Sequence, residues 1–411
     1  MGHNGNSYYI GIDLNDSYAM VSYFQQNMKE PETVSTVAGS EEFQIPLVLA
    51  RRKSIGKWYY GDEARKLSKS GEMVCIDQLL KRALNSEKIV IDDDSFMAEE
   101  LLALFLKKVM ELPSKLGNPS SFDRLVICVD RLTKENVSMF YGMAVRLGVN
   151  SRQLTVLDRK ESFYFALNQD KSLWLHDVVM FMQEKESIFF YSLKRDLRTT
   201  PQVVSIDESI SYTLDKNDKD KSFLDIINES FKNQIISTVF LVGDTFAEGW
   251  MKQSVALLCK GRRVFMGNNL FTKGACYAAA TRDKEAEWPF VYMGENEMKF
   301  NLSLKVHDKG ELSFYNLISA GSNWFESKGQ CEVIISGSYE VDFWKQLPKS
   351  REAKIETLRL TDMPPRPDRA TRIRITATPV SDDRIDIEIK DLGFGEIFMS
   401  SGKVWHYEMT M

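Results

Sequence analysis

The sequence predicts a two-lobed, layered α/β domain over residues 1–284, followed by a mostly-β sandwich over residues 289–411. In the first two-thirds, buried strands alternate with amphipathic helices, which is typical of layered α/β structure. Two strand–helix–strand units bracket the middle of the chain, which predicts two lobes. Beyond "TRDKEAEWP", apolar and polar residues alternate, which is typical of half-buried antiparallel strands.

The first element is a hairpin, "YYIGIDLNDSYAMVSYF", in which two apolar runs flank a polar turn. Asp13 ends the first run. Hairpins of this kind grip phosphate at the start of many ATPases. The next apolar residues recur at helical spacing and predict a helix over 97–112, ended by Pro113.

A parallel crossover is expected next. "RLVICVD" predicts a strand buried on both faces, and Thr133 is placed to cap a helix that Gly148 ends. "QLTVLD" predicts the following strand. Two strands joined this closely by a helix form a right-handed parallel unit.

The same pattern returns later in the chain. "TVFLVGD" predicts a buried strand, followed by a helix over 247–260 and a strand over 262–267. Thr272 is then placed to cap a short helix that runs to residue 280. Residues 214–222 are interpreted as a charged, solvated loop, and no internal repeat is detected.

The last third predicts antiparallel strands. One hairpin places Ile373, Ile375, Ile385 and Ile387 on its inner face, on either side of the turn "SDDR". Further strands are expected over 301–306 and 332–335. The aromatic residues of this domain are expected either to fill its core or to form an exposed anchor for a protein partner, and these residues are Trp324, Phe325 and Trp344.

Composition favours a cytoplasmic protein. The chain has 411 residues and a net charge of −5, so no basic surplus indicates a nucleic-acid or membrane partner. No apolar run approaches the ~18 residues of a membrane span, and the start does not look like a signal peptide. Five scattered cysteines favour a reduced compartment, and four isolated histidines without Cys-x-x-Cys argue against a structural zinc site.

The order of these parts resembles that of the 70-kilodalton heat-shock chaperones, whose ATPase domain belongs to the actin, hexokinase and chaperone superfamily. "IGIDLNDSYAMV" resembles the first phosphate hairpin, and "VFLVGDTFAEGWMKQSV" with "FTKGACYAAA" resembles the adenosine turn and its closing helix. "LRLTDMPPRPDRATRIRITATPVSDDRIDIEIKD" resembles a hairpin of the peptide-binding domain. The resemblance implies an actin-like (ribonuclease H-like) first domain and a peptide-binding second domain.

The resemblance also implies a vestigial nucleotide cleft, in which Asp13 would hold a metal-bound water. Each site residue has a structural alternative: Asp13 can end a strand, Asp244 and Thr245 can cap a helix, and Gly274 can serve helix packing. The expected cleft residues are Asp13, Asn15, Ser17, Gly243, Asp244, Thr245 and Gly274.

Departures from the family pattern predict that the chemistry is lost. Asp16 places a carboxylate where phosphate would lie, and "VVMFMQEKESIFFYSLKRD" lacks the glycines of the second phosphate loop and predicts a plain hairpin. The family's lysine falls at Leu79 or Lys81, and the connecting helix starts unusually at residues 158–161. No resident cofactor is therefore expected, and ATP with magnesium is the alternative.

Three functional hypotheses follow from the sequence. The first is a chaperone-like pseudo-ATPase that binds a protein or peptide without nucleotide. The second is an atypical ATPase or kinase of the same superfamily, for which no general base or phosphate clamp is evident. The third is a sensor that binds a nucleotide without turnover. The missing phosphate loops favour the first, and Asp13, Gly243 and Gly274 keep the third open.

Overall fold

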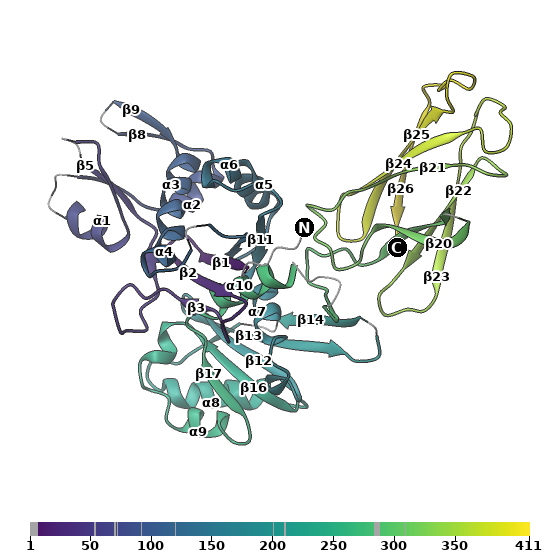
Figure 1. Cartoon of the computed structure of the whole chain (residues 1–411). Helices are drawn as coiled ribbons and strands as arrows, with labels where there is room; N and C mark the ends of the chain where they lie inside the picture. Colours follow the sequence, from purple (N-terminus) through teal and green to yellow (C-terminus); the bar gives the residue numbers. More distant parts are fainter. Residues whose placement is uncertain are drawn as a thin grey trace. The chain divides into compact units, whose positions relative to one another are not determined.

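The computed structural model divides the chain into two compact units (Figure 1). Met1–Lys194 with Ile206–Trp288 form the first unit, and Arg195–Ser205 with Pro289–Met411 form the second. The chain combines α/β structure with many strands. The structure describes residues 7–52, 55–69, 71, 73–91, 93–119, 121–199, 201–208, 211–282, 288–308 and 310–411, so part of the charged segment "TRDKEAEWP" lies outside the described residues.

The first unit begins with a mixed sheet of strand order β11-β10-β1-β2-β3. The strand β1 (Tyr8–Leu14) is buried along its whole length and pairs antiparallel with β2 (Tyr18–Gln25). On its other side β1 pairs in parallel with β10 (Arg124–Val129), which pairs in parallel with β11 (Leu154–Asp158). The short strand β3 (Glu32–Thr33) completes the order. The predicted hairpin and parallel unit are both confirmed.

The second sheet of this unit repeats that arrangement. Its strand β12 (Asp177–Glu184) pairs antiparallel with β13 (Ser187–Asp196) and in parallel with β16 (Ile236–Val242). The strand β16 then pairs in parallel with β17 (Arg263–Met266). The order β13-β12-β16-β17 therefore has the same polarity as β2-β1-β10-β11. The duplication is structural and is not accompanied by a detectable repeat in the sequence.

Two helices that follow these sheets cross each other. The helix α7 (Arg159–Leu167) follows β11, and α10 (Leu270–Arg282) follows β17, packs on α7 and lies on β1 (Figure 1). Thr272 lies inside α10, and its hydroxyl donates to the carbonyl of Gly11 at 3.0 Å. The prediction that Thr272 caps this helix is therefore wrong, because its hydroxyl fixes α10 to β1.

Other predicted helices are confirmed with different ends. The helix α3 (Ala98–Met110) ends before Pro113, which lies in the first turn of α4 (Leu112–Lys115). Thr133 caps α5 (Lys134–Gly142) in a capping box with Asn136. The remaining elements around the first sheet are α6 (Ala144–Leu147), β4 (Ile45–Pro46), β5 (Leu49–Arg52), β6 (Trp58–Tyr60), α1 (Gly61–Ser68), β7 (Met73–Ile76), α2 (Leu79–Leu84), β8 (Lys88–Ile91) and β9 (Asp94–Met97).

The segment expected to be a charged loop over residues 214–222 is partly helical. Asp218 caps α8 (Lys219–Ser230), and its carboxylate accepts the N–H of Lys221 at 3.1 Å. The apolar face of α8 packs into the core of the second sheet through Phe223 and Ile227. The remaining elements of this lobe are β15 (Tyr212–Thr213), the 3-10 helices η1 (Lys171–Leu173) and η2 (Asp244–Ala247), and α9 (Gln253–Leu258).

The second unit is built on two four-stranded antiparallel sheets that share one apolar core. Ile373, Ile375, Ile385 and Ile387 are at most 1% exposed in this core, which confirms the predicted inner face. The first sheet has the order β20-β19-β22-β23, and the second has the order β21-β24-β25-β26. Their strands are β19 (Asn301–Asp308), β20 (Glu311–Ile318), β21 (Gly329–Ile334), β22 (Glu340–Gln346), β23 (Ala353–Arg359), β24 (Arg372–Pro379), β25 (Arg384–Gly393) and β26 (Val404–Thr410).

Two further strands, which end the strand order β17-β16-β12-β13-β14-β18, precede this sandwich. The strand β18 (Phe290–Tyr292) pairs in parallel with β14 (Gln202–Glu208). The sandwich therefore starts several residues after Pro289, at β19.

Candidate functional site

The turn of the first hairpin is held by its own polar atoms. The side-chain oxygen of Asn15 accepts the N–H groups of Ser17 at 2.8 Å and Tyr18 at 2.9 Å. The N–H of Asn15 donates to the carbonyl of Tyr18 at 3.0 Å. Asn15 thus closes an Asx turn, so its side chain serves the hairpin itself.

Asp16, the acidic residue that departs from the chaperone pattern, has a structural contact. One of its carboxylate oxygens accepts the backbone N–H of Lys81 at 3.1 Å, near the start of α2. Leu79 is fully buried, and the Lys81 side chain is exposed. Neither of the two residues considered for the family's lysine lines the cavity described below.

Asp13 is fully buried at the end of β1 and is paired with an arginine. Nε of Arg159 donates to Oδ1 of Asp13 at 3.2 Å, and a terminal guanidinium nitrogen donates to Oδ2 at 3.2 Å. Both side chains are shielded, because Arg159 is 12% exposed and Asp13 is 0% exposed. A bidentate guanidinium–carboxylate pair of this kind has a defined geometry and is strong when shielded from water.

Arg159 is further fixed by the walls around it. Its guanidinium lies 2.7 Å from a carboxylate oxygen of Asp130 and donates to the hydroxyl of Tyr18 at 3.2 Å. It also lies 5.0 Å from the centre of the Phe271 ring, as in a cation–π contact. The position beside Asp13 is therefore already occupied by a protein cation.

This charge arrangement sets the protonation of the neighbours. Burial, with the charge of Asp13, raises the pKa of Tyr18 to about 12 and holds the pKa of the Cys128 thiol well above its ordinary value. Burial opposes the charged form of Arg159, but Asp13 and Asp130 outweigh it, so the pKa of Arg159 is raised. At neutral pH Arg159 is charged, and Tyr18 and Cys128 are neutral. The Tyr18 hydroxyl and the Cys128 thiol are therefore not activated as a nucleophile or base.

The turn between β12 and β13 is hydrogen-bonded to the turn that follows β16. The side-chain oxygen of Gln183 accepts the N–H of Thr245 at 2.9 Å, and its amide donates to the carbonyl of Lys185 at 3.0 Å. Gly243 has a φ of +123°, and a Cβ added there would lie 2.5 Å from Cβ of Gln183. Gly243 therefore permits a close approach of two protein turns. The prediction of a plain hairpin at β12 and β13 is confirmed.

Asp244 and Thr245 do not cap a helix through their side chains. Asp244 begins η2 without a side-chain capping hydrogen bond. The helix expected over 247–260 is reduced to α9, and its first N–H groups are bound by Asp220, which accepts from Gln253 at 2.8 Å and from Ser254 at 3.0 Å. The capping alternative for this pair is therefore wrong.

Gly274 lies in the crossing of α10 with α7. A Cβ added there would overlap the carbonyl oxygen and hydroxyl of Ser162. The Ser162 hydroxyl in turn donates to the carbonyl of Phe271 at 2.6 Å. The packing alternative thus describes the observed environment of Gly274.

A cavity of about 460 Å³ lies within the first unit. Its volume falls in the range of small-molecule sites. The structure brings four of the predicted residues to its walls, namely Asp13, Ser17, Gly243 and Asp244. Asn15, Thr245 and Gly274 are not among its lining residues.

The charge of this cavity is unfavourable for a nucleotide phosphate. Carboxylates outnumber guanidiniums in its lining, and two like charges ~4 Å apart repel by about 4 kcal/mol at an effective dielectric near 20. Among the residues that the structure describes, no group of three or more His, Cys, Asp or Glu side chains is arranged to hold a metal ion. The carboxylates are Asp13, Glu41, Glu42, Asp62 and Asp244, and the guanidiniums are Arg65 and Arg159.

Sequence reasoning missed the two residues that define this site. In the sequence pattern Arg159 falls in the unusual start of the connecting helix over residues 158–161, and Gln183 falls in the expected plain hairpin. The pair Asp13–Arg159 spans 146 positions in the sequence. The available signal was the placement of both residues at the carboxyl ends of parallel strands of one sheet, β1 and β11, which lie on either side of β10, since such ends meet at one edge of a sheet.

A sequence model for the C-terminal part of a family of unknown function, DUF5716, matches residues 30–295. The chain belongs to this family. A second model, for a domain of unknown function termed DUF8552, matches residues 297–411. No curated protein matches the chain. Within the described part of this DUF5716 member, no helix combines the length and apolar character needed to cross a membrane.

Proposed function

We propose that this DUF5716 member is a catalytically inactive relative of the actin-like ATPases, with the domain order of the 70-kilodalton heat-shock chaperones, and that its second unit binds extended polypeptides without nucleotide. The duplicated strand order of the first unit supports the actin-like assignment. Each lobe also contributes a hairpin to the cavity, which supports the same assignment. Asp13 lies near the end of β1 and Gln183 near the end of β12, and these are equivalent strands of the two sheets.

The observation that carries the inactive assignment is the bidentate contact of Arg159 with Asp13. The resemblance assigns Asp13 to a metal-bound water, and here a guanidinium neutralises that carboxylate. A magnesium ion would have to displace Arg159 from Asp13 and leave the buried guanidinium with Asp130 as its remaining carboxylate partner. Such a displacement is strongly unfavourable, since breaking a shielded ion pair costs about 3–5 kcal/mol.

A surface of the second unit supports polypeptide binding. On the sheet β20-β19-β22-β23, Phe314 and Ile355 are 58% and 52% exposed, and Trp344 is half-buried beside them. The rings of Phe314 and Trp344 lie 5.2 Å apart. Trp344 pairs with Ile355 across β22 and β23. We call these three residues the outer stripe.

The outer stripe faces away from the core. Leu304 and Phe343 pair across β19 and β22 and are both buried in the core. Successive residues of a strand face opposite sides of the sheet, so Lys305 and Trp344 lie on the outer face. Nζ of Lys305 lies 5.6 Å from the centre of a Trp344 ring. Exposed aromatic and aliphatic groups beside a cation suit an apolar peptide that also carries a carboxylate.

Fluorescence polarisation with a varied set of apolar peptides tests this function. We expect micromolar or weaker binding that is the same with and without MgATP, and that falls at least tenfold in Phe314→Asp. Val145→Asp is the control, because Val145 is 86% exposed in the first unit. No binding by any peptide would remove the polypeptide-binding proposal.

The cavity volume favours one second candidate, a sensor that binds a nucleotide without turnover. Its acidic lining opposes this function. Peptide binding that weakens on addition of MgATP would support the sensor and contradict nucleotide independence.

A further inference from the structure

The loop over residues 394–403, between β25 and β26, presents three large apolar side chains to solvent. Phe394 is 42% exposed, Ile397 is 86% exposed and Met399 is 76% exposed. Three such residues within six positions form an apolar tip, which we call the loop tip. Exposed apolar groups gathered in this way mark interaction sites.

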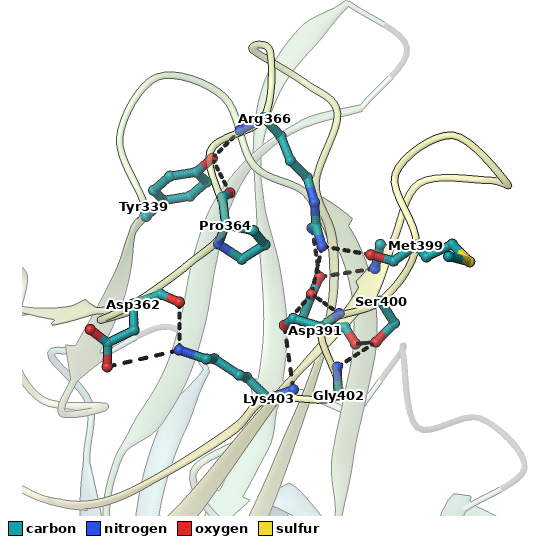
Figure 2. Close-up of polar contacts among 11 residues, drawn as sticks. Tyr339, Asp362, Pro364, Arg366, Asp391, Met399, Ser400, Gly402 and Lys403 are labelled. Carbon is teal, nitrogen blue, oxygen red and sulfur yellow. Dashed lines mark hydrogen bonds and ion pairs between the residues drawn. The ribbon is translucent and has the colours of Figure 1, made fainter.

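A buried ion pair fixes the base of the loop tip (Figure 2). Both terminal guanidinium nitrogens of Arg366 donate to the carboxylate of Asp391 at 2.8 Å, and the two side chains are 3% and 0% exposed. The same carboxylate accepts the N–H of Gly393 at 2.9 Å and the N–H of Ser401 at 2.7 Å. Asp391 therefore binds both ends of the loop.

The loop is also tied to the neighbouring segment. Arg366 donates to the carbonyl of Met399 at 2.9 Å, and its own N–H donates to the hydroxyl of Tyr339 at 3.0 Å (Figure 2). Within the loop, the N–H of Phe394 donates to the carbonyl of Phe398 at 2.6 Å. A loop held at this many points loses little conformational freedom on binding, so its apolar groups are preorganised for a partner.

The loop tip and the outer stripe are complementary in charge. Glu396 is exposed between Phe394 and Ile397, and Lys305 is exposed beside Trp344. Asp342 lies on the same face as Lys305, but its carboxylate accepts the hydroxyl of Thr357 at 2.5 Å. Since both apolar surfaces are exposed within a single second unit, the loop tip does not cover the stripe of its own chain.

We propose that the loop tip of one copy of this chain docks on the outer stripe of a second copy. This inference rests on the proposed function, because it names the polypeptide that the stripe binds. The two surfaces differ, so the contact is heterologous. Repeated from copy to copy, such a contact forms a closed ring or an open chain, whereas a two-fold dimer would make the same contact twice.

Sedimentation equilibrium of the full chain tests the contact. We expect reversible self-association with a dissociation constant on the order of micromolar or weaker, because a loop tip buries a small area. Ile397→Asp and Phe314→Asp should each weaken the association at least tenfold. Val145→Asp should leave it unchanged, since Val145 has the same 86% exposure as Ile397. Ile355→Asp replaces Phe314→Asp if that variant does not fold.

The decisive experiment mixes the two variants with weakened association, Ile397→Asp and Phe314→Asp. Ile397→Asp retains an intact stripe, and Phe314→Asp retains an intact tip, so their mixture should regain one contact per pair and associate again. A mixture that stays monomeric while the unaltered chain associates would overturn the proposed contact.

The two proposals can fail separately. A chain that remains monomeric but binds apolar peptides would overturn the self-docking and leave the proposed function standing. Association that follows the mixing pattern without any binding of unrelated peptides would support the self-docking and overturn general polypeptide binding.

Discussion

Arg159 decides what the cleft can do, because it places a permanent cation against the buried Asp13. Replacing Arg159 with Met leaves that carboxylate without its partner. We expect Arg159→Met to lower the free energy of unfolding by about 3–5 kcal/mol. The double variant Asp13→Leu/Arg159→Met should recover most of this loss, since it removes both charges together.

Urea unfolding measures both variants. Arg65→Met is the control, because Arg65 also lines the cavity but is exposed, and it should change the free energy of unfolding by less than about 0.5 kcal/mol. A double variant as unstable as Arg159→Met would contradict the assigned ion pair.

Asp391 makes a pH-dependent contribution to the second unit. Burial alone would raise its pKa, but the hydrogen bonds from Arg366, Ser401 and Gly393 outweigh burial and hold the pKa well below its ordinary value. Because the folded pKa is lower than the unfolded value of about 3.9, this stabilisation is present above pH ~4 and is lost as the pH falls below it.

We expect Asp391→Asn to be less stable than the unaltered chain at pH 7 and to show a flatter decline of stability between about pH 4 and pH 2. Urea unfolding followed by tryptophan fluorescence at several pH values measures the difference. The same acid dependence in both proteins would show that Asp391 does not contribute in this way.

Among the elements, the crossing of α7 with α10 depends on one glycine. Gly274→Ala places a methyl group against backbone and side chain of Ser162, and we expect a loss of stability of about 1–3 kcal/mol. Gly142→Ala is the matched control in α5, where an added Cβ meets nothing within 4 Å. That control should be stabilising by about 0.5–1 kcal/mol in thermal unfolding. Equal effects at both positions would contradict the close crossing.

Whether a segment forms a helix or a strand could be predicted where its residue pattern or its capping residue is distinctive. The strand β10 reads as an apolar run, and the cap of α5 by Thr133 is a local signal. Thr272 was misassigned because an N-cap residue and a threonine that bonds a distant carbonyl look alike in sequence. The length of α9 was overestimated because apolar periodicity does not reveal where Asp220, from another helix, binds its first N–H groups.

The candidate site was less predictable than the fold. Sequence reasoning placed Asp13, Ser17, Gly243 and Asp244 together, and the structure brings these four to one cavity. It could not anticipate that Arg159 would neutralise Asp13, because that contact depends on the tertiary arrangement of strand ends. Gly274 and Asn15 serve packing and turn geometry, for which the same residue types are also common.

At the scale of the whole molecule, the two units support one interpretation. The first unit has a duplicated α/β scaffold whose cavity is acidic and whose buried Asp13 carboxylate is paired with Arg159. The second unit keeps a well-packed β-sandwich with exposed apolar groups on its sheet face and loop tip. The proposed function therefore separates polypeptide binding from nucleotide chemistry.

Isothermal titration of the purified full chain with ATP and magnesium tests this separation most directly. We predict no saturable heat of binding up to millimolar nucleotide, and hydrolysis no faster than in buffer alone. Arg159→Met should remain equally inactive, because the acidic lining and the interlocked turns are unchanged. Saturable binding or turnover that is lost in Asp13→Ala would contradict the account.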